Sequence, residues 1–282
     1  MLAGRGYSFN VQQAHATLVE TVKQYSHNIG FAGDFVVGLS GGIDSALVAE
    51  IAVEAFGPGR VHGIILPSNT TSEKSVELAM QLGKNLGIDV QGLPIGKIVD
   101  DFTANFQKNF RCELGLLTKG NISARMRMVS LMAASNEFGW KVLNTGNRTE
   151  AMLGYCTLHG DMVGEFSPIG DAFKTEVYQL AELVNMLSVG ETGAERIPQE
   201  IITRPATAEL MEGQTDEGEI GANYATIDRI LWGRFVQEMS VDEFVQFGFN
   251  ENVVNSILNR VQQNAFKARF YAPHPVIHPE FN

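Results

Sequence analysis

The sequence predicts an α/β fold with three layers, in which helices cover both faces of a parallel sheet of about five strands. Short apolar runs alternate with longer segments that carry apolar residues at helical spacing. The first such run, Phe35 to Leu39, passes through a glycine turn directly into a helical pattern. Strands that alternate with helices require crossover connections, and these produce a parallel sheet. Beyond about residue 171 the strand-like runs stop, so additional helices follow the sheet.

The first two strand–helix units are bounded by strong signals. A leading helix over 9–29 carries Val11, Ala14, Leu18, Val22 and Tyr25 at helical spacing. The strand over 35–39 is followed by a helix over 44–56. The second strand, over 61–66, ends at Pro67, which cannot donate to a strand ladder.

The next units follow the same alternation. The segment Thr71-Ser72-Glu73 combines a helix cap with an acidic first turn, and the helix continues to Leu86. Ile88 to Leu93 is the third predicted strand, and a helix over 96–110 follows it. Residues 112–120 are predicted to be a loop.

The last strands complete the predicted sheet. Asn121 is expected to cap a long helix that ends at Phe138, and the fourth strand covers 141–144. The turn Thr145-Gly146-Asn147 closes that strand, and a short fifth strand is expected over 166–169. The result is a Rossmann-like α/β/α arrangement.

We predict one domain over 1–282, with a nucleotide-binding core over 34–170 and a mostly helical part over 171–282. The helices of the second part are expected over residues 173–188, 222–233, 240–248 and 250–268. Two polar, glycine-containing stretches, 188–200 and 212–221, are expected to be mobile. The second is either a solvated linker or a lid that orders over a substrate.

Composition excludes several classes of protein. The net charge of −11 disfavours nucleic acid as a partner, because phosphates need a positive surface. No apolar run reaches the length of a membrane span. The two cysteines form no C-x-x-C pair and are typical of thiols in a reducing cytosol, so we expect a cytoplasmic protein. His274 and His278 lack an evident third metal ligand.

The turn Ser40-Gly41-Gly42-Ile43-Asp44-Ser45 is the most informative segment. It joins a strand to a helix N-terminus, where unpaired backbone N–H groups favour a phosphate. No lysine is present, so this is not a Walker-type loop. Asp44 beside phosphates suggests an intervening Mg²⁺ ion. The alternative is an ordinary capped Gly-Gly turn. Since ligands bind at the carboxyl ends of parallel strands, 40–45 and 145–150 are expected to face one crevice.

The motif Ser-Gly-Gly-Ile-Asp-Ser resembles the pyrophosphate loop of the ATP pyrophosphatases, which cleave ATP between the α- and β-phosphates. Further segments match the NAD synthetase family in order along nearly the whole chain. These are Asn121–Met128, Asn144–Glu150, Gly154–Asp161, Phe173–Thr175, Arg204–Leu210 and Gln214–Glu217. The sequence therefore resembles NAD synthetases of the ammonia-dependent, synthetase-only type.

The resemblance implies a reaction. ATP would adenylate the nicotinate carboxylate of deamido-NAD and release pyrophosphate, and ammonia would attack the adenylate to give NAD and AMP, the final step of NAD biosynthesis. Adenylation matters because a carboxylate is a poor electrophile with a poor leaving group. The family also implies a homodimer with the dinucleotide site near the interface.

The resemblance also implies roles for individual residues. Asp44 and Glu150 would hold Mg²⁺, while Asp161 and Lys174 would be catalytic, Asp161 toward ammonia and Lys174 toward the α-phosphate. The ATP-binding set is Gly38, Leu39, Ser40, Gly41, Gly42, Ile43, Asp44, Ser45, Thr145, Lys174 and Thr207. The deamido-NAD set is Arg125, Glu165, Phe266 and Lys267. Four of these residues also have a structural alternative: a surface lysine for Lys174, a structural arginine for Arg125, a loop cap for Asp161 and a helix-start carboxylate for Glu150.

Some positions depart from the ammonia-dependent pattern. Leu158 stands where lysine is common, Glu165 where aspartate is common, and Phe266-Lys267 where His-Lys is common. The segment 157–162 is closer to the synthetase part of glutamine-dependent enzymes, yet residues 1–33 are far too few for a glutaminase domain, so none is expected. Two rivals stay open: an ATP pyrophosphatase acting on another carboxylate, and a non-enzymatic nucleotide-binding subunit or sensor.

Overall fold

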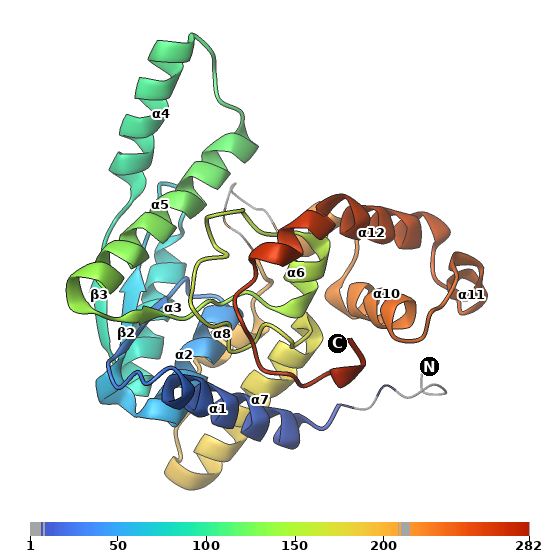
Figure 1. Cartoon of the computed structure of the whole chain (residues 1–282), viewed down its shortest axis with the longest axis horizontal. Coiled ribbons are helices and arrows are strands. Elements are labelled where there is room, and N and C mark those ends of the chain that lie inside the picture. Colours follow the sequence, from blue (N-terminus) through green and yellow to red (C-terminus); the bar gives the residue numbers. More distant parts are fainter. Residues whose placement is uncertain (1–6, 8, 208, 210–214, 282) are drawn as a thin grey trace.

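A computed structural model describes residues 7, 9–207, 209 and 215–281 and confirms the α/β prediction (Figure 1). The sheet consists of β1 (Phe35–Gly38), β2 (Val61–Ile65), β3 (Asp89–Gly92) and β4 (Lys141–Val142). Its strands are all parallel, in the order β3-β2-β1-β4. Phe35 on the central strand β1 is in register with Val61 on one side and Lys141 on the other.

The predicted fifth strand does not form. Phe166 makes a single parallel bridge to Leu143, so the described sheet has four strands instead of about five. The ladder stops because the next backbone group is used elsewhere: the N–H of Ser167 donates to the carbonyl of Pro273 at 2.9 Å. The C-terminal segment therefore takes the hydrogen bond that a fifth strand would need.

Two layers of helices cover the sheet. The larger layer contains α1 (Val11–Asn28), α2 (Ile43–Phe56), α3 (Glu73–Leu86), α7 (Lys174–Thr192) and α8 (Gln199–Thr203). Its core includes Phe35 and Val37, whereas Val36, between them, packs into the opposite core. This second core includes residues of α4 (Gly96–Phe110) and α5 (Leu116–Phe138). The alternation along β1 is that of a strand buried on both faces.

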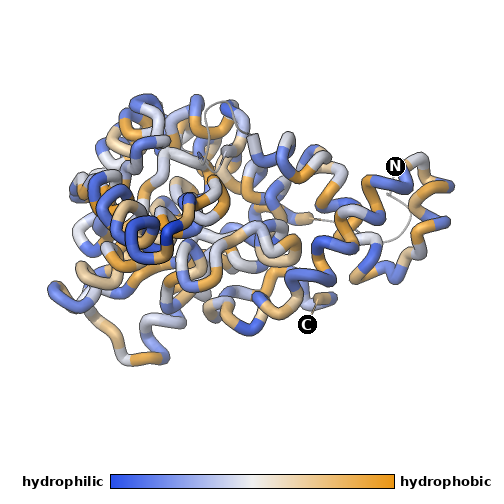
Figure 2. Tube along the Cα trace, turned by 90° about the horizontal axis from the view of Figure 1, so that it is seen from above, coloured by the Kyte–Doolittle hydropathy of each residue, from blue (hydrophilic) through white to orange (hydrophobic). Residues whose placement is uncertain are grey.

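The remaining helices form a separate apolar cluster beside this unit. They are α6 (Arg148–Leu153), α9 (Asp216–Ile220), α10 (Tyr224–Phe235), α11 (Val241–Gln246) and α12 (Glu251–Asn264). Buried Leu153, Leu231 and Phe244 belong to the cluster, which also contains Phe173 from the turn before α7. Hydrophobic and hydrophilic residues alternate along these helices, as expected for elements with one buried side (Figure 2).

Several predicted boundaries are wrong. Helix α5 begins at Leu116, after Gly115, so part of the predicted loop over 112–120 is helical. Asn121 lies inside α5, where it caps nothing: its Oδ1 accepts a hydrogen bond from Thr157 Oγ1 at 2.7 Å. Helices α7 and α8 occupy much of the stretch 188–200.

Two smaller outcomes concern the C-terminal part. Of the stretch 212–221, residues 212–214 lie outside the described residues, and Asp216–Ile220 form the short helix α9. Helix α12 ends at Asn264, and a 3₁₀ segment, Ala265–Phe270, follows it. Among the described residues, no helix is long and apolar enough to cross a membrane.

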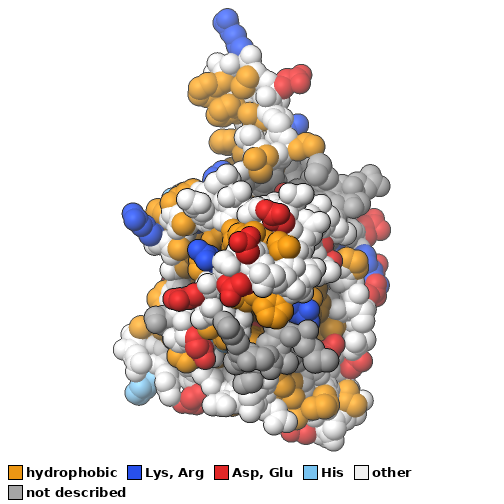
Figure 3. Space-filling view, turned by 90° about the vertical axis from the view of Figure 1, so that its right-hand side faces the viewer, with side chains coloured by type: hydrophobic (Ala, Val, Ile, Leu, Met, Phe, Trp, Pro, Cys, Tyr) orange, Lys and Arg blue, Asp and Glu red, His pale blue; other side chains and the backbone are white. Residues whose placement is uncertain are grey.

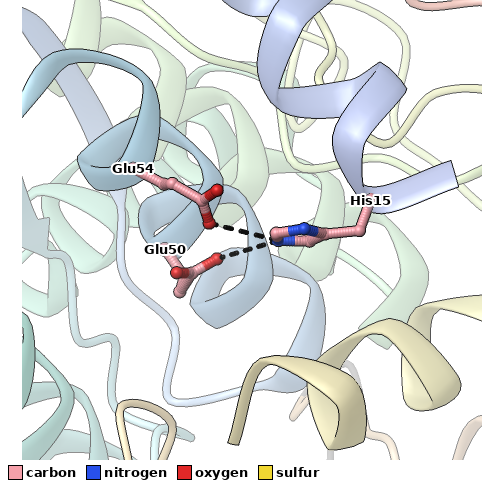
Figure 4. Close-up of side chains that lie close together, drawn as sticks. All are labelled: His15, Glu50 and Glu54. Atoms are coloured by element: carbon pink, nitrogen blue, oxygen red, sulfur yellow. Dashed lines mark ion pairs between the residues drawn. The ribbon is translucent and has the colours of Figure 1, made fainter. Parts of the chain in front are cut away.

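Helices α1 and α2 are joined by a buried histidine between two carboxylates (Figure 4). His15 Nε2 lies 3.3 Å from Glu54 Oε2 and 3.8 Å from Glu50 Oε2. The neighbouring carboxylates of Glu50 and Glu54 raise the pKa of His15 to about 9, so it carries a proton at neutral pH. A protonated imidazole has no lone pair for a metal ion, and Arg196 Nη1 already contacts Glu50 Oε1 at 2.6 Å. We interpret this group as an ion-pair cluster that fastens α1 to α2.

Candidate active site

A cavity of about 890 Å³ opens at the carboxyl edge of the sheet. Ser40, Asp44, Thr145 and Glu150 all line it, as do residues of α5 and α12. The structure thus confirms that the two polar turns, 40–45 and 145–150, meet at one crevice. Ligands of open parallel sheets bind at this edge.

The glycine turn between β1 and α2 contains a backbone conformation that residues with a side chain rarely adopt. Gly41 has φ +76°, and a Cβ atom there would lie 2.3 Å from the carbonyl oxygen of Ser75. The hydroxyl of Ser40 accepts from the N–H of Gly42 at 3.1 Å, and the N–H of Ser40 donates to Ser45 Oγ at 3.2 Å. The turn is therefore braced by its own serines.

The N-terminus of α2 is suited to an anion. Gly42 is the cap residue, and its position provides no side-chain hydrogen bond to the first turn. The first N–H groups of the helix therefore stay available, and the helix dipole adds partial positive charge there. Gly42 and Ile43 both line the cavity. A phosphate group fits this position.

Lys174 lies between the two predicted metal ligands. Its Nζ is 2.5 Å from Asp44 Oδ2 and 3.1 Å from Glu150 Oε1. Asn147 contacts both carboxylate-bearing segments: its Nδ2 donates to Asp44 Oδ1 at 2.8 Å, and its Oδ1 accepts from the N–H of Glu150 at 3.0 Å. Two carboxylates that converge beside a turn suited to an anion form a donor set that fits Mg²⁺ together with phosphate oxygens.

The buried charges of this group shift one another's protonation. Burial raises the pKa of Glu150 to about 7, against the lowering effect of Lys174. Burial alone would lower the pKa of Lys174, but Asp44 and Glu150 outweigh it and raise that pKa. Lys174 is 1% exposed and is therefore a fixed buried cation, which excludes the alternative of a surface lysine.

Asp161 faces the same cavity from a loop. Its Oδ1 accepts the N–H of Thr157 at 2.7 Å, and its carbonyl oxygen accepts from Asn144 Nδ2 at 2.8 Å. Asp161 is an exposed residue that lines the cavity, and desolvation by the surrounding cavity walls raises the pKa of its carboxyl group to about 6. A carboxylate with such a pKa can accept a proton near neutral pH.

Comparisons with known proteins identify the family. A family model described as NAD synthase matches residues 14–270. The chain belongs to the NAD synthase family. The family resemblance inferred from the sequence is thereby confirmed.

Relatives in this family are of two kinds. The chain is 38% identical to a glutamine-dependent NAD(+) synthetase of Thermotoga maritima over 92% of its own length, but spans only 44% of that protein. It is 35% identical to an NH(3)-dependent NAD(+) synthetase of Chlorobaculum tepidum, over 92% of this chain and 87% of the relative. The chain thus spans less than half of one type and most of the other.

Solved structures show the same likeness. An NMN synthetase from Francisella tularensis superposes with a TM-score of 0.78 at 28% identity, covering 93% of this chain and 97% of that chain. An NH3-dependent NAD synthetase from Campylobacter jejuni, in complex with the nitrate ion, gives 0.72 at 27% identity, over 92% and 96%.

The structure brings most of the predicted ATP set of this family together. The cavity lining includes Gly38, Leu39, Ser40, Gly42, Ile43, Asp44, Thr145, Lys174 and Thr207. Gly41 and Ser45 do not line it and instead shape the turn, as described above. Most of the residues predicted to bind ATP therefore face a single cavity.

The predicted deamido-NAD set is divided. Lys267 lines the cavity, with its Nζ donating to the carbonyls of Gly154 and Cys156 at 2.7 Å. Three others lie outside the lining. Arg125 Nε donates to the carbonyl of Leu158 at 3.3 Å, Glu165 pairs with Lys141, and Phe266 is 53% exposed.

Sequence reasoning missed several polar groups of the site. Asn147 and Arg127 lie inside segments that matched the family, so the motifs could have identified both as site residues. Arg127 lines the cavity and donates to the carbonyl of Leu66 at 3.2 Å. Arg260 and Asn259 reach the cavity from α12, where the sequence shows only helical periodicity. That contribution depends on tertiary packing.

Proposed function

We propose that the chain is an NAD synthetase that amidates deamido-NAD to NAD, consuming ATP and ammonia and releasing AMP and pyrophosphate through an adenylate intermediate. The observation that carries the proposal is the buried Lys174 between Asp44 and Glu150, next to the anion-binding turn and inside the main cavity. This arrangement suits attack of a carboxylate on an α-phosphate.

The residues divide the chemistry between them. The N-terminus of α2 would bind the phosphates that leave as pyrophosphate, with Thr207 as a further phosphate contact. Asp44 and Glu150 would hold Mg²⁺, which would neutralise phosphate charge when bound. Lys174 would neutralise the charge that develops on the α-phosphate as the adenylate forms. Asp161 would orient ammonia and accept its proton.

Binding of deamido-NAD is proposed at the part of the cavity that Lys267 and Asp161 line. Arg125 and Phe266 lie outside that lining and would contact the dinucleotide only where it extends beyond the cavity. Glu165 is committed to Lys141, so its predicted contact with deamido-NAD receives no support from its position.

The nitrogen donor and the substrate can be determined together. Purified protein with ATP, Mg²⁺ and deamido-NAD is expected to form NAD and AMP in equal amounts when ammonium is added. Glutamine alone should give much less product, since the chain spans 87% of an NH(3)-dependent relative but only 44% of a glutamine-dependent one. Absence of ammonium-dependent NAD would contradict the proposal.

A second substrate has support from one comparison. The superposition on the structure described as an NMN synthetase has a TM-score of 0.78 and covers 97% of that chain. Nicotinate mononucleotide is therefore the competing substrate. Comparing kcat/KM for deamido-NAD and for the mononucleotide would decide between them.

A homodimer is also proposed. Helix α4 and the start of α5 project from the body, and hydrophobic side chains gather on the projection (Figures 1 and 3). Its exposed apolar residues are Ile98, Phe102, Phe110, Leu116 and Leu117. Such a surface favours a protein partner, and Leu117 also lines the cavity, which would place the site near the interface. Light scattering is expected to give twice the chain mass, and Leu117→Asp is expected to reduce it.

We further propose that the protein works in the cytoplasm. Cys112 and Cys156 are both free thiols, and burial raises the pKa of Cys156 to about 11, which keeps it unreactive. Activity in cell extract that fractionates with the cytosol would support this.

A further inference from the structure

Asp228 is a buried carboxylate behind the cavity. It lies on α10, is 6% exposed and is not among the residues that line the cavity. One oxygen accepts from Thr149 Oγ1 at 2.6 Å, and the other accepts from the N–H of Thr175 at 2.8 Å. A single side chain thus contacts both α6 and α7.

These two contacts adjoin the reactive groups. Thr149 immediately precedes Glu150, and Thr175 immediately follows Lys174. The N–H of Lys174 itself donates to Thr149 Oγ1 at 2.8 Å. Since the hydroxyl of Thr149 carries a single proton, it accepts from Lys174 and donates to Asp228, and the direction of the chain of bonds is fixed.

The start of α7 is held by side chains throughout. The N–H groups of Phe173, Lys174 and Thr175 donate to Glu176, Thr149 and Asp228, in that order. These are the groups that a helix N-terminus leaves without partners. The negative charge of Asp228 also lies near the positive end of the helix dipole and stabilises it. The backbone that carries Lys174 is therefore fixed relative to α6.

We propose that Asp228 is a positioning residue that sets the placement of Glu150 relative to Lys174, acting through Thr149 and Thr175 without touching a substrate. The inference rests on the proposed function, because it assigns those two side chains to the reaction. A carboxylate is required, since both of its oxygens accept. In an Asp228→Asn variant the amide NH₂ would face either the Thr149 hydroxyl or the Thr175 N–H, and one bond would be lost.

The test compares Asp228→Asn with a control on the same helix. Ile230→Ala removes a fully buried apolar side chain of α10 and no hydrogen bond of Asp228, so it controls for lost core packing on the same helix. Both variants are assayed well below their melting temperatures. We expect Asp228→Asn to lower kcat about tenfold and to raise the Mg²⁺ concentration for half-maximal rate several-fold, with KM for deamido-NAD little changed. Ile230→Ala is expected to change neither.

Two further variants separate positioning from folding. Thr149→Val breaks the same chain of bonds while leaving α10 intact, so it is expected to reproduce the effects of Asp228→Asn even if that protein fails to fold. Thr149→Ser keeps the hydroxyl and is expected to retain wild-type kinetics. The double variant Asp228→Asn/Thr149→Val is expected to be no worse than either single change, because the two residues act as one unit.

The result that would overturn the proposal is a Mg²⁺ dependence in Asp228→Asn and Thr149→Val equal to that of Ile230→Ala. Calorimetric titration of ATP at several Mg²⁺ concentrations gives a second readout, which needs no turnover. If the wild-type protein made no NAD, the proposed function would fail, while that titration would still decide whether Asp228 positions Glu150 and Lys174.

Discussion

The ammonium group of Lys174 lies 2.5 Å from a carboxylate oxygen of Asp44, and 130 positions of sequence separate the two residues. Asp44 is in the first turn of α2, whereas Lys174 begins α7. The contact therefore joins two helix N-termini of the larger helical layer at the edge of the cavity. It holds a cation at the place where phosphate charge would accumulate, and it keeps a carboxylate oriented toward the same place.

The first prediction concerns this pair. Asp44→Asn is expected to lower turnover by about a hundredfold or more, because an amide is a far weaker Mg²⁺ ligand than a carboxylate. The fold should persist, since Lys174 keeps Glu150 as a partner. Steady-state assays over a Mg²⁺ series, with thermal melting in parallel, would measure both effects. Glu182→Gln, an exposed change on α7, is the control, and activity of Asp44→Asn within a few-fold of wild type would refute the metal assignment.

Two glycines give a matched pair of predictions with opposite sign. Gly41→Ala would place a Cβ atom 2.3 Å from the carbonyl oxygen of Ser75, at φ +76°, so we expect a loss of about 2 kcal/mol in the free energy of unfolding. Gly190, inside α7, has no atom within 4 Å of an added Cβ, so Gly190→Ala is expected to stabilise by about 0.5–1 kcal/mol. Urea denaturation measures both. Equal stability of the two variants would show that the turn tolerates a side chain.

The sequence was most informative where local chemistry decides the structure. The glycine turn, the strand before it and the helix after it depend on neighbouring residues, and all three were predicted correctly. The prediction of a fifth strand was wrong because the N–H of Ser167 donates to the carbonyl of Pro273, more than a hundred positions away. No local sequence pattern indicates such a contact. The prediction that Asn121 caps a helix was wrong for a similar reason: asparagine is a common cap residue, but the helix begins earlier, at Leu116.

The site shows the same division. Asp44, Glu150 and Lys174 were found through motifs, and the structure brings them together. Asp228 was not found, because an aspartate inside an amphipathic helix gives no signal until the fold places it against Thr149, 79 positions earlier. Supporting residues that lie on distant elements are the part of a site that pattern reasoning reaches last.

The second functional prediction separates the two half-reactions. Asp161→Asn is expected to leave adenylation, measured as ATP–pyrophosphate exchange with deamido-NAD, within a few-fold of wild type. The ammonia-dependent step should slow by about tenfold to a hundredfold, because the variant cannot accept a proton. Loss of both steps to the same extent would indicate a structural role for the loop.

The same residue predicts a pH dependence. The pKa of Asp161 is raised to about 6, so the carboxylate is charged above that pH and becomes protonated below it. The rate of the ammonia step, plotted against free NH₃, should therefore fall below about pH 6 in wild type and show no such fall in Asp161→Asn. Lys267 and Arg127 are the neighbouring cations that favour the charged form. ATP–pyrophosphate exchange, measured over the same pH range, is the control for effects of Glu150 titration on adenylation.

The last prediction concerns stability rather than activity. The pKa of His15 is raised from 6.5 to about 9 by the neighbouring carboxylates of Glu50 and Glu54. The folded protein therefore binds the proton more tightly than the unfolded chain does, and the stabilisation is fully present below about pH 6.5 and disappears as the pH rises through 9. A shift of this size corresponds to at most roughly 3–4 kcal/mol. His15→Gln is thus expected to be less stable than wild type at pH 6 and much closer to it at pH 10, as measured by urea denaturation. His27→Gln, exposed near the end of the same helix, is expected to show no such trend.

Zn²⁺ is expected to leave the melting temperature at pH 7 unchanged, since a proton occupies Nε2 of His15. A zinc-dependent rise that His15→Gln abolished would show instead that this cluster is a metal site.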